Sequence, residues 1–98
     1  MISKPWFVYI LKCTDATFYT GISPDVEQRV KTHNLGKASR YTRARLPVKV
    51  IYIEQCADRS EASKREAEIK KLSKKKKLKL VILAKRGWIP LLAEGNDN

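Results

Sequence analysis

Two apolar runs near the start of the chain, at residues 6–12 and 18–22, constrain the fold most. The first run is nearly all aliphatic or aromatic, which is typical of a strand buried on both faces. Asp15 and Ala16 lie between the runs, where a short connection favours antiparallel pairing. The sequence therefore predicts a β-hairpin as the first unit of the fold.

A helix, a loop and a third strand are predicted after the hairpin. Ser23 is expected to cap the helix, with Pro24 at its first position and Gly36 at its end. Residues 37–47 read as a basic loop, and residues 48–54 read as the third strand.

Two further helices are predicted from their caps. Asp58 and Glu61 have the spacing of a capping box, and Ser73 can cap the next helix. The inward residues expected of these two helices are Ala62, Ile69, Leu72, Leu78, Val81 and Ile82. The order ββαβαα predicts a small α/β domain of the α+β type, with a three-stranded, mainly antiparallel sheet flanked by helices.

The 98 residues are expected to form one domain over residues 1–93, followed by a disordered tail at residues 94–98. No apolar run approaches the roughly 20 residues that span a bilayer, and the segment before the first strand is short for a secretory signal. Cys13 and Cys56 are too few for a disulfide framework and lack the spacing of a zinc site. These features predict reduced thiols and a cytoplasmic protein, with association with the nucleoid as a variant of that location.

The chain is strongly basic, with 21 Lys and Arg against 10 Asp and Glu and a formal charge of +11. Such a field favours polyanions, of which nucleic acid is the leading candidate. An acidic membrane surface or an acidic protein is the alternative, as is a protein kept soluble by its lysines. Charge alone does not separate DNA from RNA.

A set of polar side chains within this small fold suits phosphodiester hydrolysis with one metal ion. The set is Tyr9, Tyr19, Arg29, His33 and Glu66. A carboxylate can hold a hard divalent cation, and the cation and an arginine can neutralise the charge of a phosphorane-like transition state. A phenol or an imidazole can take a proton from water.

Each member of this set also has an ordinary structural interpretation. Tyrosines in strands usually pack in the core, and His33 falls within the apolar stripe of its helix. For Arg29 the alternative is a weak ion pair with Asp25, one turn earlier. Glu66 lies at the border of its helix's apolar stripe, so the residue pattern alone is also compatible with a solvated carboxylate.

Two basic segments are candidates for contact with a nucleic-acid backbone. The first interleaves cations with an aromatic ring and contains Lys37, Arg40, Tyr41, Arg43 and Arg45. The second is the run Lys74, Lys75, Lys76 and Lys77. This run crowds a helix start, where the macrodipole disfavours cations and a bound phosphate would relieve them. A solvated face is the alternative for the lysine run.

Two short motifs in this order resemble those that name the GIY-YIG nuclease domain family. They are Phe7-Val8-Tyr9 and Tyr19-Thr20-Gly21. Arg29 on the following helix matches the family's arginine, and Glu66 matches its metal-binding glutamate. The resemblance covers about residues 5–83 and is greatest to the small stand-alone bacterial members.

The resemblance implies a metal-dependent endonuclease that hydrolyses phosphodiester bonds in DNA, on structured or damaged DNA as in DNA repair. Glu66 would hold Mg²⁺ or Mn²⁺, and Tyr9 and Tyr19 would be candidates for the general base or for positioning the water. Arg29 would stabilise the transition state, and His33 would carry a proton or bind phosphate. A protein partner can supply specificity in such a system. The alternative is a non-catalytic or weakly catalytic module of the same fold that binds DNA or RNA.

Overall fold

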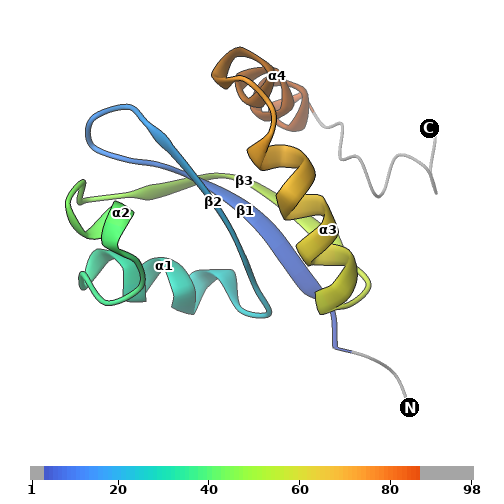
Figure 1. Ribbon diagram of the computed structural model, residues 1–98, viewed down its shortest axis with the longest axis horizontal. Coiled ribbons are helices and arrows are strands. Elements are labelled where there is room, and N and C mark those ends of the chain that lie inside the picture. Colours follow the sequence, from blue (N-terminus) through green and yellow to red (C-terminus); the bar gives the residue numbers. More distant parts are fainter. Residues whose placement is uncertain (1–3, 87–98) are drawn as a thin grey trace.

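A computed structural model describes residues 4–86 and contains one three-stranded antiparallel sheet in the order β2-β1-β3 (Figure 1). The strands are β1 (Trp6–Lys12), β2 (Phe18–Ser23) and β3 (Lys49–Cys56). The helices are α1 (Val26–Asn34), α2 (Arg40–Arg43), α3 (Arg59–Lys70) and α4 (Lys74–Lys85). The predicted α+β fold is therefore confirmed, and the tail predicted at residues 94–98 lies outside the described residues.

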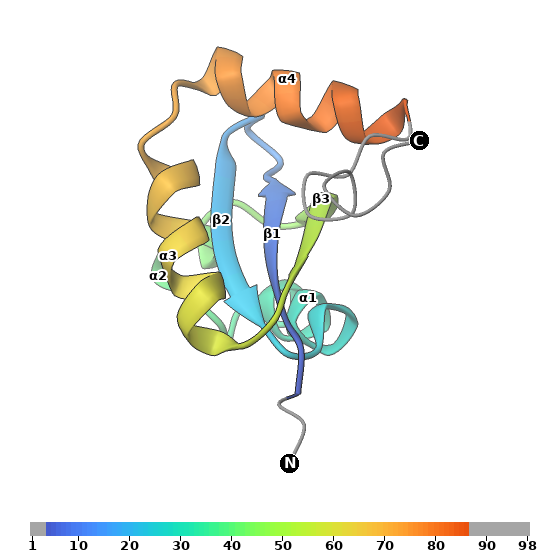
Figure 2. The ribbon, with the colours of Figure 1, turned by 90° about the vertical axis from the view of Figure 1, so that its right-hand side faces the viewer.

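The central strand β1 supplies alternate side chains to two cores, one on each face of the sheet. Val8 and Ile10 pack toward α3 and α4, whereas Tyr9 and Leu11 pack toward α1. In Figure 1, α3 and α1 lie on opposite sides of the sheet, and Figure 2 shows α4 crossing one end of it. Burial on both faces explains why the first run of the sequence is almost continuously apolar.

The start of α1 differs from the prediction. Asp25 is the N-cap, and its carboxylate accepts a hydrogen bond from the Gln28 N–H at 3.1 Å. The Ser23 hydroxyl instead accepts from the Asp25 N–H at 2.9 Å and so shapes the turn before the helix. The end of α1 agrees with the prediction, because Gly36 follows it with φ at +76°, a conformation in which glycine carries no side-chain penalty.

The predicted basic loop is interrupted by the one-turn helix α2. Ser39 caps it, since the Ser39 hydroxyl oxygen accepts from the Thr42 N–H at 3.1 Å. This cap joins a serine to the backbone N–H three residues later, as N-caps usually do. The turn of α2 also places the Thr42 side chain in the protein interior.

The caps predicted for α3 and α4 are confirmed. Asp58 accepts from the Glu61 N–H at 2.9 Å, while Glu61 reaches back to the Ala57 N–H at 2.7 Å. Ser73 accepts from the Lys76 N–H at 3.2 Å. Two backbone donors at the start of α3 are thus satisfied much as in a capping box, except that Glu61 bonds the N–H of Ala57, one residue before the N-cap, and not that of Asp58.

The predicted inward faces of these helices are confirmed in part. Ala62, Ile69 and Val81 are buried, but Leu78 and Ile82 remain 42% and 50% exposed. The prediction is wrong for Leu78 and Ile82, because α4 packs on the core through Val81 together with Leu80 and Ala84. Leu72 follows the end of α3 and is half-buried.

A buried ion pair joins β3 to α3. The Glu54 side chain is 2% exposed and accepts from the Arg65 Nε, with distances of 3.1 Å to Oε1 and 2.8 Å to Oε2. The Tyr52 hydroxyl also donates to Glu54 Oε1 at 2.6 Å. Arg65 Nη1 contacts Glu68 at 3.0 Å on the solvent side. The sequence places Arg65 near the middle of the inward stripe of α3, but Glu54 as its partner is not predicted.

We expect Arg65→Met to destabilise the fold strongly, because it leaves the buried Glu54 carboxylate without its counter-charge. Breaking a buried pair in this way costs about 3–5 kcal/mol, which urea denaturation would measure. Glu68→Gln is the matched control, since it removes the exposed partner of Arg65 and should cost less than about 1 kcal/mol. Equal losses for the two variants would contradict the assignment.

Candidate active site

Three buried side chains from three elements form a hydrogen-bonded chain. Tyr9 Oη of β1 lies 3.0 Å from His33 Nε2 of α1, and His33 Nδ1 lies 2.8 Å from Thr42 Oγ1 of α2. All three residues are at most 1% exposed. The two predicted site residues Tyr9 and His33 are therefore in direct contact, and Thr42 is a third member that is not predicted from the sequence.

The direction of these hydrogen bonds follows from the protonation of the groups. Burial raises the pKa of Tyr9 to about 12, so the phenol keeps its proton at neutral pH and needs an acceptor for it. Burial, and then the nearby Arg29 charge, lower the pKa of His33, so the imidazole is neutral. We therefore assign the phenol as donor to Nε2 and Nδ1–H as donor to Thr42. The Thr42 hydroxyl can in turn donate a hydrogen bond to the Ser39 carbonyl oxygen, 3.4 Å away.

Gly21 makes room for the Tyr9 side chain. It lies opposite Tyr9 in the β1–β2 pairing, and a Cβ there would come within 2.6 Å of Tyr9 Oη. The Tyr19 ring lies on the same face, with an edge-on contact to the His33 ring at 5.1 Å between centroids. The glycine of the second motif is thus required because the phenol of the first motif crosses directly over it.

The charges of Arg29 and Glu66 both affect the pKa of the Tyr9 phenol. Arg29 is exposed on α1, one turn before His33, and it favours the ionised form of Tyr9, whereas Glu66 adds to the rise in the pKa of Tyr9. The alternative of an Arg29–Asp25 ion pair is wrong for the described residues, whose ion pairs do not include it. Tyr9, Tyr19 and His33 are therefore in contact with one another, and the charges of Arg29 and Glu66 act on the Tyr9 phenol in opposite directions.

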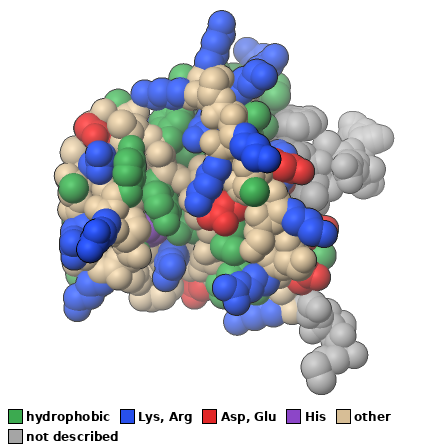
Figure 3. Space-filling view, viewed as in Figure 1, with side chains coloured by type: hydrophobic (Ala, Val, Ile, Leu, Met, Phe, Trp, Pro, Cys, Tyr) green, Lys and Arg blue, Asp and Glu red, His purple; other side chains and the backbone are tan. Residues whose placement is uncertain are grey.

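Glu66 comes from α3, whose buried residues pack on the opposite face of the sheet from Tyr9. Its side chain is 22% exposed and forms an ion pair with Lys70 at 3.2 Å. On the face shown in Figure 3, acidic side chains lie over α3 with Lys and Arg side chains around them. The helix thus brings a carboxylate into a basic surface, where it can meet both a cation and a phosphate.

The donor set around Glu66 fits a hard divalent cation that is held partly by substrate. Within residues 4–86 no group of three or more His, Cys, Asp or Glu side chains could enclose a metal. Mg²⁺ usually keeps several waters and binds through one or two carboxylates plus substrate phosphates. One partly exposed carboxylate, with Lys70 as a counter-ion that a metal can replace, meets that requirement.

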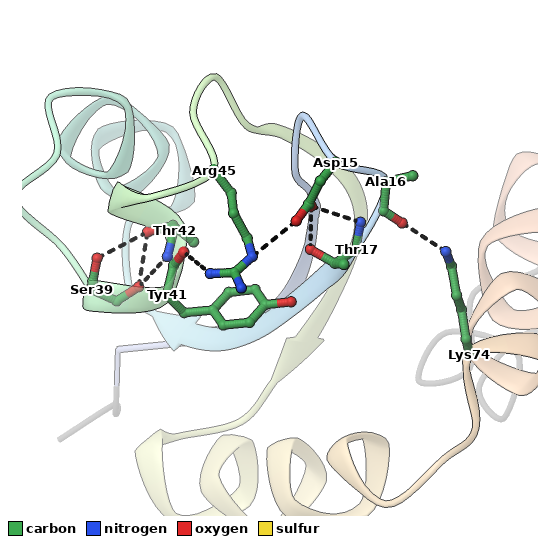
Figure 4. A network of polar contacts seen from close by, with 8 residues as sticks. All are labelled: Asp15, Ala16, Thr17, Ser39, Tyr41, Thr42, Arg45 and Lys74. Carbon is green, nitrogen blue, oxygen red and sulfur yellow. Dashed lines mark hydrogen bonds and ion pairs between the residues drawn. The ribbon is translucent and has the colours of Figure 1, made fainter.

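Two of the predicted nucleic-acid contacts have structural partners instead (Figure 4). Arg45 donates from Nε to Asp15 at 3.0 Å and from Nη1 to the Tyr41 carbonyl oxygen at 2.9 Å. Its guanidinium also lies 3.9 Å from the centre of the Tyr41 ring. Lys74 donates to the Ala16 carbonyl oxygen at 2.8 Å, which ties α4 to the hairpin turn.

The other predicted contacts remain accessible to a ligand. Residues of this set that are exposed and carry no ion pair among the described residues are Lys37, Arg40, Arg43, Lys75 and Lys76. Lys77 is half-buried, and Tyr41 is exposed while its ring stacks with that of Tyr19. Contact of these residues with nucleic acid stays a prediction.

A protein-family model described as the GIY-YIG catalytic domain matches residues 5–79, which is most of the chain. The chain belongs to the GIY-YIG family. The tyrosines of its two motifs, Tyr9 and Tyr19, lie on either side of Gly21, the glycine of the second motif. The family match supports a nuclease-type function for this fold.

Similar proteins are small bacterial members of the UPF0213 group. The chain is 51% identical over 84 residues to a UPF0213 protein of Desulfotalea psychrophila, covering 85% of this chain and 76% of the relative. It is 47% identical over 78 residues to a UPF0213 protein of Streptococcus agalactiae, with 80% and 89% covered. The solution NMR structure of a UPF0213 protein from Bacillus halodurans is 42% identical, with a TM-score of 0.53 and coverage of 81% and 84%.

The comparison with the Bacillus halodurans structure bears out the three-stranded α+β fold. Within residues 4–86, no helix has both the length and the apolar character that a membrane span requires.

We expect Gly21→Ala to push the Tyr9 hydroxyl away from His33, because the new methyl group would overlap the phenol. Overpacking of this kind typically costs about 1–3 kcal/mol, which thermal or urea unfolding would measure. Thr20→Val is the matched control one residue earlier. The Thr20 hydroxyl is buried without a partner among the described residues, so its removal should be neutral or stabilising. A Gly21→Ala protein as stable as wild type would refute the close approach.

The lowered pKa of His33 predicts a stability that depends on pH. In the window below the ordinary value of 6.5, the unfolded histidine binds a proton that the folded one does not. Stability from this group is therefore complete above that value and decreases as the pH falls from about 7 toward 5. Urea denaturation at several pH values should show this slope, and His33→Gln should remove it. A slope that persists unchanged in His33→Gln would assign it to other groups.

Proposed function

We propose that this protein is a divalent-metal-dependent endonuclease that hydrolyses phosphodiester bonds in DNA. The observation that carries the proposal is the chain from Tyr9 through His33 to Thr42, with the charges of Arg29 and Glu66 directed at the same phenol. A phenol bonded to a neutral imidazole can accept a proton, and a cation and a carboxylate beside it suit a phosphate and a metal.

In this proposal Tyr9 and His33 act together as the base. A neutral phenol can take a proton from water only if it gives up its own, and His33 Nε2 is 3.0 Å away to receive it. The proton then resides on the imidazole, whose other nitrogen is held by Thr42. Because Tyr9 is almost wholly covered, we place the water at the edge of the hydroxyl that faces Arg29. That side chain is long and exposed, so it can move when it takes a phosphate oxygen.

Arg29 and Glu66 supply the electrostatic part of the reaction. The planar guanidinium of Arg29 can hold two oxygens of the scissile phosphate as negative charge builds on them. Glu66 would hold Mg²⁺ or Mn²⁺, and such an ion, when bound, neutralises phosphate charge and lowers the pKa of water. Tyr19, which is partly exposed and packs edge-on against His33, would border the phosphate and position the water.

The net charge of +11 supports a nucleic-acid substrate. The exposed cations of the segment around α2 belong to the same loop as Thr42, so a backbone bound there would lie beside the proton chain. We propose structured or damaged DNA as the substrate, with a protein partner supplying specificity and a cytoplasmic location. A binding module without cleavage is the competing function.

We expect Glu66→Gln to abolish cleavage while leaving DNA affinity near or above the wild-type value. The carboxylate is assigned to the metal, whereas the lysines and arginines supply the binding. Branched, flapped and duplex DNA incubated with Mn²⁺, with an EDTA control, would test cleavage, and titration of the same DNA would test affinity.

Glu68→Gln is the control for this experiment. It removes a neighbouring carboxylate of α3 that is 66% exposed, so cleavage should continue at about the wild-type rate. Cleavage by Glu66→Gln at the wild-type rate would refute the metal assignment. Tight binding without any cleavage by the wild type would favour the binding module.

A further inference from the structure

The helix that carries Glu66 has little apolar surface to set its rotation about its own axis. Among the 12 residues of α3, the buried ones are Ala62 and Ile69. Arg65 comes three residues after Ala62 and four before Ile69, so it lies on the same stripe of the helix. The middle of the face that α3 turns toward the sheet is therefore occupied by a cation.

Arg65 reaches across the central strand to the far strand of the sheet. Its partner Glu54 lies in β3, opposite Val8 of β1, and the Arg65 Nε–H is shared between the two carboxylate oxygens, at 2.8 and 3.1 Å. Tyr52 holds the same carboxylate from its own strand at 2.6 Å. The Glu54 carboxylate is thus held in place by its own strand, and its contact with Arg65 restrains the rotation of α3 about the helix axis.

Glu66 follows Arg65 directly and points about 100° further round the helix, since an α-helix has 3.6 residues per turn. With Arg65 directed at β3, the charge of Glu66 acts on Tyr9, whose hydroxyl lies over Gly21 of β2. The strands β3 and β2 flank β1 on opposite sides. Arg65 thus contacts the outer strand β3, while the next residue, Glu66, points in another direction and pairs with Lys70.

We propose that Glu54, acting through Arg65, is a positioning residue that orients the Glu66 carboxylate for metal binding, an inference that rests on the proposed function. Neither Glu54 nor Arg65 contacts the metal or the substrate. Without the pair, α3 keeps its caps and its buried Ala62 and Ile69 but loses the interaction that sets its rotation about the helix axis. The Glu66 carboxylate then samples other directions, and the affinity for metal falls.

The test uses a double variant, Glu54→Leu with Arg65→Met, which removes both charges together. It is made in a Tyr52→Phe background, because the buried Tyr52 hydroxyl would otherwise lose its acceptor. Replacing a buried pair by apolar side chains of similar volume usually keeps the protein folded, unlike removing one partner. Mn²⁺ is titrated without substrate, and paramagnetic broadening of backbone amide NMR signals near Glu66 gives the dissociation constant. We expect this constant to rise about tenfold or more, as for other groups that orient metal ligands. The thermal unfolding temperature is measured in parallel and should stay close to that of the wild type.

Two further variants make the result specific. Glu68→Gln removes the exposed partner of Arg65 and should leave Mn²⁺ affinity within about twofold of wild type. Arg65→Lys keeps the charge but loses the planar guanidinium, whose Nε and Nη1 contact Glu54 and Glu68 at the same time, so its affinity should fall between those of the wild type and the double variant. If the double variant does not fold, Arg65→Lys decides the question, and an unchanged affinity there overturns the proposal.

The outcomes separate this inference from the proposed function. Wild-type binding that is lost in Glu66→Gln but unchanged in the folded double variant refutes the positioning role alone. Broadening near Glu66 that is absent from the wild type, or that persists in Glu66→Gln, refutes the metal assignment and the positioning role with it. Loss of affinity in the double variant at a wild-type unfolding temperature supports the inference.

Discussion

The hydrogen bond between Tyr9 Oη and His33 Nε2 connects the sheet to both helices on one of its faces. It joins β1 to α1 directly and, through the other imidazole nitrogen and Thr42, to α2. The bond is buried, so each partner depends on the other for a hydrogen-bond acceptor or donor that water does not supply. Gly21 is constrained by the same bond, because the phenol must cross it to reach the imidazole.

The two faces of the sheet contribute different parts of the candidate site. The α1 face supplies the hydrogen-bonded chain Tyr9–His33–Thr42. The helix α3, which packs on the other face, supplies the Glu66 carboxylate. A three-stranded sheet is narrow enough for a helix beside the edge strand β2 to influence a phenol on the opposite face. Each core is built on alternate residues of β1, so the relative placement of both parts depends on that one strand.

Polar burial is high for a domain of this size. His33, Thr42 and Glu54 are all buried, and each has hydrogen-bond partners among the described residues. Uncompensated burial of such groups would cost more than a small core can offset. Thr42 has a hydrogen-bond partner close by in the chain, because its hydroxyl bonds Ser39, the cap of α2. Glu54 has a distant partner, because Arg65 belongs to a helix that follows it in the chain.

The sequence by itself determined the strands, the helix caps of α3 and α4 and the residue types of the candidate site. These follow from short-range patterns: the continuous apolar run of β1, the Asp58–Glu61 spacing, and the order of tyrosine, arginine and glutamate. The sequence pattern predicts the wrong cap for α1, because the Ser23 hydroxyl bonds within the turn before the helix. It also predicts the wrong inward face for α4, because that helix packs through Leu80, Val81 and Ala84.

Only the tertiary structure decided which side chains meet. Three side-chain pairs join residues that are 9, 11 and 30 positions apart in the chain. They are His33 with Thr42, Arg65 with Glu54, and Arg45 with Asp15. Such pairings depend on how helices pack on two faces of a sheet, and no local pattern encodes that packing. For the same reason, the sequence names Glu66 as a candidate, but only the structure shows that this carboxylate lies on α3 beside Lys70, next to the arginine that pairs with Glu54.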